Sequence, residues 1–194
     1  MTNRNRIPSG SVSLVLLLLA SCQSSESRRF ADWLERGRPC ITLAGCDQTW
    51  IDEGSRIPDV EARLRAVLVR NRDGETAAVA AAYLAEKGTS ASVPELIGAL
   101  SSKHELVQVN CVWALGSLKA AEAEQPIMDM LDSDKLGLRA NAASALASIG
   151  GERLVPFLER QLQRDEWVGK CIRAAIKRAK EPPTTTAPTQ LDPR

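Results

Sequence analysis

The most reactive side chains of this sequence belong to its five cysteines, which stand in very different surroundings. Cys22 closes an N-terminal segment that has two arginines, Arg4 and Arg6, then an apolar run from Val12 to Ala20, then small residues. This order is the layout of a secretory signal. The apolar run has nine residues, whereas a membrane-spanning helix needs about 20. We therefore expect the segment to direct export and to be removed, rather than to stay as a transmembrane anchor.

The segment Leu19-Ala20-Ser21-Cys22 resembles the lipobox of bacterial lipoproteins. The resemblance implies that the Cys22 thiol receives a diacylglycerol, that a peptidase cuts before it, and that the new amino group is acylated. Two or three acyl chains, at roughly 0.8 kcal/mol per buried CH₂, make a stable anchor. Gln23 follows in place of an aspartate. By resemblance to sorting in enteric-type bacteria, this favours the periplasmic face of the outer membrane over the inner membrane. The alternative is an ordinary signal peptide that ends by chance in a cysteine.

The other four cysteines are expected to be structural. Cys40 and Cys46 stand in a short apolar, glycine-bearing stretch, and export to an oxidising compartment would allow them to form a disulfide. Two half-buried thiols are the alternative. Cys111 and Cys171 fall on inward-facing positions of expected helices, where a cysteine acts as a small hydrophobe.

Other catalytic candidates are scarce. The only histidine, His104, stands in the turn SSKHE, and we expect a solvated polar side chain there. The sequence has no glycine-rich phosphate loop and no His, Asp and Glu cluster with metal-ligand spacing. We therefore predict no enzyme activity, no metal, no small-molecule substrate and no cofactor beyond the covalent lipid.

Charge and composition narrow the class of partner. The chain has 25 basic and 24 acidic residues, and loss of Arg4 and Arg6 with the leader changes the net charge from +1 to −1. A near-neutral chain without a basic stripe lacks the electrostatic footprint of a nucleic-acid-binding protein. Hydrophobic residues make up 44% and aromatic residues 4%. This composition, dominated by Ala, Leu and Val, favours closely packed helices.

The elements that would position these residues repeat along the chain. Leu84, Leu115 and Leu146 lie 31 residues apart, and each closes an alanine-rich stretch. A fixed period of this length is the mark of a stacked-repeat architecture. After a first helix that begins at Pro58, the pattern predicts A helices at about 75–87, 106–118, 137–149 and 168–179, and B helices at about 93–100, 124–131 and 153–162. Small and large residues recur in columns, so that helices approach closely and fill the space between layers.

The segment DKLGLRANAASALASIG, Asp134 to Gly150, resembles the HEAT-repeat family, in its short variety named after the phycobilisome lyases. Over about residues 59–180 the resemblance implies an all-α, right-handed α-solenoid of about three and a half helical pairs. Arg139 matches an arginine that pairs with acidic turn residues in such solenoids, but Gln108 and Ala77 stand one and two periods earlier. We therefore expect this polar ladder at most once, with the register set mainly by apolar packing.

The remaining segments are expected to flank the solenoid. We predict a signal peptide at 1–21, a lipidated tether and loop-rich cap at 22–56, the repeat domain at 57–180 and a disordered Pro/Thr-rich tail at 181–194. Within the cap, RRFADWLERG predicts a short helix that ends at Gly37, whereas no period is evident from Cys40 to Ser55. We interpret Trp33 and Trp50 as cover for the exposed apolar face of the first repeat.

Helical pairs without catalytic chemistry favour a binding role. We predict a protein–protein interaction scaffold or adaptor, anchored by lipid in the bacterial envelope, with a protein as its partner. The candidate surface comprises B-helix positions outside the packing columns: Gly98, Met128, Asp129, Met130, Phe157 and Arg160. The alternative for the two methionines and the phenylalanine is that they complete the core or pack under the tail. Two other functions stay open: a chromophore-lyase-like enzyme, by family analogy alone, and a permanent structural subunit of an envelope complex.

Overall fold

A computed structural model describes residues 25–37, 46–70, 73–161 and 166–180, and every regular element in these ranges is a helix. Two helices, α2 (Ser25–Arg36) and α3 (Gln48–Gly54), precede the repeats. The repeats comprise α4 (Val60–Arg70), α5 (Gly74–Lys87), α6 (Val93–Ala99), α7 (Glu105–Ser117), α8 (Glu124–Met130), α9 (Leu136–Gly150), α10 (Val155–Gln161) and α11 (Glu166–Lys180). Short 3-10 turns lead into α6, α8 and α10: η2 (Ser90–Ser92), η3 (Ala121–Ala123) and η4 (Gly151–Leu154).

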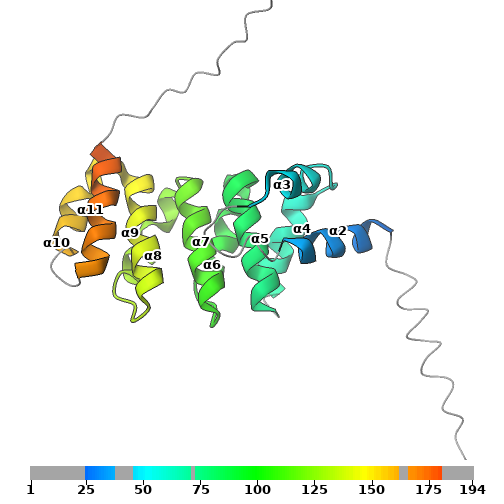
Figure 1. Ribbon diagram of the computed structural model, residues 1–194, viewed down its shortest axis with the longest axis horizontal. Helices are drawn as coiled ribbons and strands as arrows, with labels where there is room; N and C mark the ends of the chain where they lie inside the picture. The colour runs from blue at the N-terminus through cyan, green and yellow to red at the C-terminus, as the bar shows by residue number, and fades with distance from the viewer. Residues whose placement is uncertain (1–24, 38–45, 71–72, 162–165, 181–194) are drawn as a thin grey trace, which may run out of the picture.

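The repeat helices are stacked along the long axis of the molecule (Figure 1). In the A layer, α5 packs against α7, α7 against α9 and α9 against α11. The B layer consists of α4, α6, α8 and α10, and each B helix packs against the A helix that follows it. Counted from α5, the described chain holds three and a half A–B units, and α4 adds one B helix before them. The all-α solenoid predicted from the 31-residue period is therefore confirmed.

Local sequence determines where several helices begin. The carboxylate of Asp73 accepts hydrogen bonds from the backbone N–H groups of Glu75 and Thr76, at 3.2 and 3.3 Å, and so caps α5. Pro94 and Pro156 are the second residues of α6 and α10. A proline in the first turn removes no intrahelical hydrogen bond, so it helps to begin a helix there.

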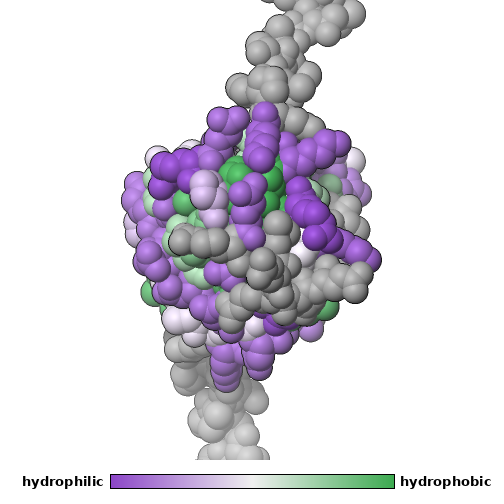
Figure 2. Space-filling view, turned by 90° about the vertical axis from the view of Figure 1, so that its left-hand side faces the viewer, coloured by the Kyte–Doolittle hydropathy of each residue, from purple (hydrophilic) through white to green (hydrophobic). Residues whose placement is uncertain are grey.

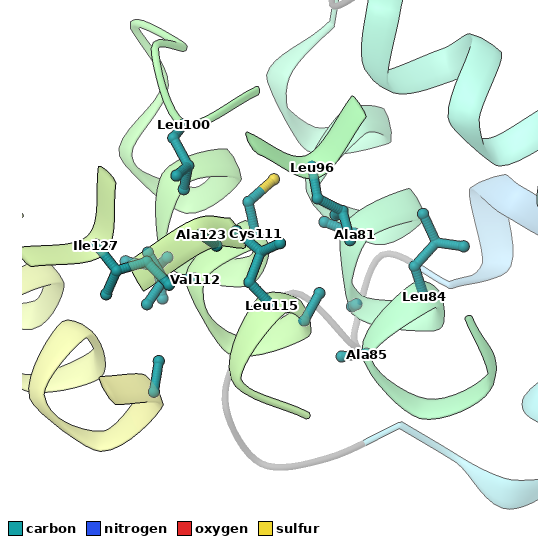
Figure 3. Close-up of a cluster of buried hydrophobic side chains, with 14 of the residues drawn as sticks. Ala81, Leu84, Ala85, Leu96, Leu100, Cys111, Val112, Leu115, Ala123 and Ile127 are labelled. Atoms are coloured by element: carbon teal, nitrogen blue, oxygen red, sulfur yellow. The ribbon is translucent and has the colours of Figure 1, made fainter. Parts of the chain in front are cut away.

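The columns of the repeat form one hydrophobic core, part of which is shown in Figure 3. Leu84, Leu115 and Leu146, which define the period, are fully buried. The corresponding residues of the B helices, Leu96, Ile127 and Leu158, are fully buried as well. Burial of one such side chain contributes about 1.5–3 kcal/mol, so apolar packing is sufficient to hold successive units in register.

Polar side chains also join neighbouring parts of the stack. Arg139 donates from Nη1 to the backbone carbonyl of Ser133 at 2.7 Å. One period earlier, Gln108 donates from Nε2 to the carbonyl of Leu100 at 3.0 Å, and its Oε1 accepts from Lys135 Nζ at 3.0 Å. Gln108 therefore makes a polar link of another kind, since an amide does not form the arginine–acid pair of the predicted ladder.

Helix α3 corrects the prediction of a loop-rich cap between Cys40 and Ser55. Asp47 caps this helix by accepting from the backbone N–H of Thr49 at 2.8 Å. A helix of seven residues shows little hydrophobic period by itself. Helices α6, α8 and α10 are equally short, but they recur at the 31-residue spacing, whereas α3 lies outside the repeat. Its buried residues nevertheless include Trp50 and Ile51.

Helix α11 covers the C-terminal end of the stack, the end that Figure 2 shows. The side packed on α9 buries apolar residues: Ile172, Ala175 and Ile176. The exposed residues include Lys170, Arg173 and Lys177, and Figure 2 shows mostly hydrophilic residues around a small apolar patch. A polar outer face is what the last helix of a solenoid requires for solubility. Cys171, predicted to face inward, is only half-buried, because among the described helices none packs over the outer side of α11.

Candidate interaction surface

The N-terminal cap is built from two segments of the same pattern, WLERG (Trp33–Gly37) and WIDEG (Trp50–Gly54). Their indole rings are stacked, with centroids 4.7 Å apart and planes inclined by 7°. Trp33 Nε1 donates to the backbone carbonyl of Trp50 and Trp50 Nε1 to that of Trp33, both at 2.9 Å. Each buried indole N–H is therefore satisfied by the other segment, as buried polar groups require.

The two glycines permit this close approach. A Cβ at Gly37 would lie 2.3 Å from the Trp50 ring, and one at Gly54 would lie 2.3 Å from the Trp33 ring. Tyr83 of α5 meets both indoles edge-on, at centroid distances of 5.1 and 5.5 Å. We call Trp33, Gly37, Trp50 and Gly54 the tryptophan clasp. It packs on the first A helix, in agreement with the interpretation of both tryptophans as cover for the first repeat.

The predicted interaction residues all belong to B helices, but they are not equally accessible. Gly98 on α6 is exposed, and a Cβ there would meet no atom within 4 Å. Asp129 on α8 is exposed and accepts a hydrogen bond from Gln125 Nε2 at 3.1 Å. The side chain of Arg160 lies outside the described part of the molecule. Gly98 is thus the most open of these positions.

The three apolar candidates are partly buried. Met128 and Met130 of α8 and Phe157 of α10 all pack against the hydrophobic core. The alternative that they complete the core therefore explains why these three side chains are apolar. Their role in partner binding stays a prediction.

Two cysteine predictions lie outside the described residues. These are the lipidation of Cys22 and the pairing of Cys40 with Cys46, since the structure describes neither Cys22 nor Cys40. Cys46 itself is half-buried at the edge of the core.

The B layer also has a surface that the sequence analysis missed, between α4 and α6. A hollow of about 320 Å³ is lined by Ala62, Arg65, Ala66, Val69, Arg70 and Glu95. Val69 is 72% exposed, which is unusual for a valine in a helix. The signal was present as a second apolar series at positions 62, 66 and 69, a spacing that brings residues to one helical face.

The carboxylate of Glu61 links α4 to the turn before α6 by hydrogen bonds. Glu61 Oε1 accepts hydrogen bonds from the Thr89 backbone N–H at 3.0 Å, from Thr89 Oγ1 at 2.8 Å and from Ser92 Oγ at 2.6 Å. Burial alone would raise the pKa of Glu61, but the hydrogen bonds from Ser92 and Thr89 outweigh it and hold the pKa below its usual value. The ionised carboxylate is therefore the form that links α4 to the turn before α6.

Glu61→Gln is expected to lower the free energy of unfolding by about 1 kcal/mol at pH 7, because a neutral amide makes weaker hydrogen bonds and the site is partly solvated. Since the folded-state pKa is lowered, this stability is fully present above the unfolded-state pKa of about 4.3 and is lost as the pH falls through the folded-state value. Urea unfolding at pH 7 and at successively lower pH should show that the difference in the free energy of unfolding between wild type and variant decreases as the pH falls. The exposed Glu86→Gln on α5 is the control; an equal effect there would contradict the role of Glu61.

The groups considered for catalysis are not arranged for it within the described structure. Cys111 is fully buried, and burial raises the pKa of its thiol, which makes the reactive thiolate harder to form. His104 is less solvated than predicted, because its ring lies against Gly74 and its buried Nε2 has no hydrogen-bond partner in the described part of the chain. Among these residues no group of three His, Cys, Asp or Glu could hold a metal ion. No helix in the same ranges is both long and apolar enough to cross a membrane.

Comparison with known proteins identifies one family to which the chain is similar. The family model of HEAT repeats matches the chain over residues 61–136 and 105–178. The two matches together extend over most of the α4–α11 stack and more than half of the 194 residues. No curated protein and no solved structure shows significant similarity to the chain.

Proposed function

Because this chain belongs to the HEAT-repeat proteins, we propose that it is a lipid-anchored adaptor of the bacterial envelope that binds a protein partner on its B layer. HEAT repeats are protein-interaction scaffolds, and solenoids of this kind present extended surfaces to their partners. Within this proposal, the lipid anchor rests on the lipobox-like segment that ends at Cys22.

The observation that carries the proposal is the open B-layer surface between α4 and α6. Its lining includes the small residues Ala62 and Ala66 and the exposed Val69. Gly98 is exposed on α6 three residues after Glu95, which also lines the hollow. The edge of the hollow carries the ion pair between Arg65 Nη1 and Glu95 Oε1, which are 3.6 Å apart. An apolar centre with charged groups at its margin is the composition expected of a protein-binding surface.

Gly98→Arg tests this surface without disturbing the core. We expect the variant to be at least as stable as the wild type, because the new side chain meets open space and arginine is a better helix former than glycine. The variant should no longer bind the protein partner, because a long charged side chain would occupy the B-layer surface. The measurement is chemical cross-linking in membranes, followed by affinity purification of the full chain and mass spectrometry.

Gly137→Arg on α9 is the matched control, since Gly137 is exposed in the A layer and a Cβ there would come no closer than 3.8 Å to another residue. Loss of the partner with Gly137→Arg but not with Gly98→Arg would place binding on the A layer and contradict the proposal. A stoichiometric partner that survives high salt would indicate a permanent structural subunit rather than an adaptor.

A further inference from the structure

A second hollow of about 320 Å³ lies beside the tryptophan clasp. The helices of the tryptophan clasp, α2 and α3, lie at the N-terminal end of the stack (Figure 1). The hollow is lined by Arg29, Trp33, Arg36, Glu53, Arg56 and Ile57. Its volume is at the lower end of the range for small-ligand sites, which is about 300–1,000 Å³. The side chains around it combine three guanidinium groups and one carboxylate with the apolar surface of an indole and an isoleucine.

The charges in this hollow are not balanced. Arg36 Nη2 lies 2.8 Å from Glu53 Oε2, although that oxygen accepts no well-directed hydrogen bond, so the contact is an ion pair held by proximity. The side chains of Arg29 and Arg56 are exposed and pair with no acidic group of the described chain. One carboxylate therefore faces three cations, and the hollow keeps a surplus of two positive charges.

This surplus favours an anion with several oxygen atoms. The guanidinium group is a planar fork of donors that matches the oxygens of phosphate or carboxylate two at a time. Arg29 and Arg56 come from different elements, α2 and the turn after α3, so they reach a bound anion from two directions. Ile57 and the edge of Trp33 would contact the carbon atoms attached to it.

The position of the hollow favours one source of that anion. Helix α2 begins at Ser25, only three residues after Cys22, and three residues span at most about 11 Å. Arg29 lies one turn further along α2. An acyl anchor on Cys22 would therefore hold the hollow close to the phosphate groups of the bilayer.

We infer that the hollow binds a phosphate group, and that an anionic phospholipid headgroup of the anchoring membrane supplies it. The headgroup source rests on the lipid anchor of the proposed function, whereas the phosphate chemistry of the hollow does not. Occupancy would fix α2, and through the tryptophan clasp the whole stack, in one orientation to the membrane surface. Each basic side chain near an anionic membrane surface adds a modest electrostatic attraction.

The first test uses a soluble probe and is independent of the anchor. The full-length protein in neutral detergent is titrated with glycerol 1-phosphate, and binding is followed by tryptophan fluorescence, since Trp33 lines the hollow. We expect saturable binding that weakens about tenfold or more in the double variant Arg29→Gln, Arg56→Gln. The matched control, Arg173→Gln with Lys177→Gln, removes the same charge from exposed residues of α11 and should bind as the wild type does.

The second test asks where the phosphate comes from. The full-length protein is reconstituted into vesicles of phosphatidylcholine alone or with about a third of phosphatidylglycerol, and hydrogen exchange of residues 25–57 is measured. We expect added protection only with phosphatidylglycerol, and no such gain in the Arg29→Gln, Arg56→Gln variant.

Each other outcome overturns a defined part of the inference. Absence of glycerol 1-phosphate binding, or equal weakening in the Arg173→Gln, Lys177→Gln control, removes the phosphate site. Binding of a glutamate-rich peptide in its place would assign the hollow to an acidic protein. Phosphate binding without any effect of phosphatidylglycerol would overturn the headgroup source. An unmodified Cys22, seen by mass spectrometry, would refute the proposed anchor while leaving the result with glycerol 1-phosphate intact.

Discussion

Trp33→Ala is expected to lower the free energy of unfolding by about 3–5 kcal/mol, the cost of removing a large aromatic side chain from a core. Trp33 is 2% exposed, stacks on Trp50 and meets Tyr83 edge-on. Its loss also leaves the carbonyl of Trp50 without its indole donor. Since a domain stability is typically 5–15 kcal/mol, the loss would be a large part of the whole.

Thermal and urea unfolding measure this effect, and a chain of this length should lose about 2–4 °C in Tm per kcal/mol. Trp33→Phe separates the packing of the ring from the hydrogen bond of the indole N–H, because it keeps an aromatic ring but removes the N–H. For this variant we expect a smaller loss of the free energy of unfolding, about 1–2 kcal/mol. Trp113→Ala on α7 is the matched control, since Trp113 is only partly buried at the edge of the core. An equal loss in both alanine variants would show that the tryptophan clasp has no special role.

Gly54→Ala examines the same contact from the other side. The new methyl group would lie 2.3 Å from the Trp33 ring and 2.5 Å from the Tyr83 ring, so it must separate α3 from α2 or from α5. We expect the near-ultraviolet circular dichroism of the stacked indoles to collapse. A variant that keeps both this signal and the Tm of the wild type would show that the rings are not held as closely as described.

The solenoid was predictable because its signal is repeated and local. Each unit places small and large apolar residues at the same helical positions, so three weak patterns reinforce one another at a spacing of 31 residues. The columns of Leu84 and Leu96 are buried as expected. By contrast α3 occurs once, and its stability depends on a contact between Trp50 and a residue 17 positions earlier. A window of local sequence contains no information about such a partner.

The candidate sites were harder to predict for a related reason. The sequence identified B-helix positions that the core does not use, and Gly98 is open as expected. The hollow beside α2 depends on how two short helices are brought together by the tryptophan clasp, and so Arg29 and Arg56 become neighbours only in the folded chain. The two WxxxG segments were nevertheless visible in the sequence. Recognition of that internal duplication would have predicted a paired cap.

The largest effect on function is expected from Cys22→Ser. A hydroxyl group is a far weaker nucleophile than a thiol, so the variant should receive no diacylglycerol and should leave the membrane fraction. Two or three acyl chains, at roughly 0.8 kcal/mol per buried CH₂, give a lipoprotein a stable anchor in the bilayer. Cell fractionation measures the loss, and mass spectrometry of the mature N-terminus identifies the modification directly. Cys171→Ser is the control, because Cys171 is a thiol on α11 at the far end of the stack.

A globomycin-type inhibitor of the signal peptidase makes this result decisive. With the inhibitor, a diacylated precursor should accumulate in the wild type and in Cys171→Ser, but not in Cys22→Ser. An unmodified chain cut at another bond would contradict lipidation, and the chain would then be an exported solenoid without an anchor. In that event α2 would no longer be held beside a bilayer, and the surplus charge of Arg29 and Arg56 would have to serve a soluble anion. Whether the Cys22 thiol is lipidated therefore determines whether the N-terminal cap faces a membrane or open solvent.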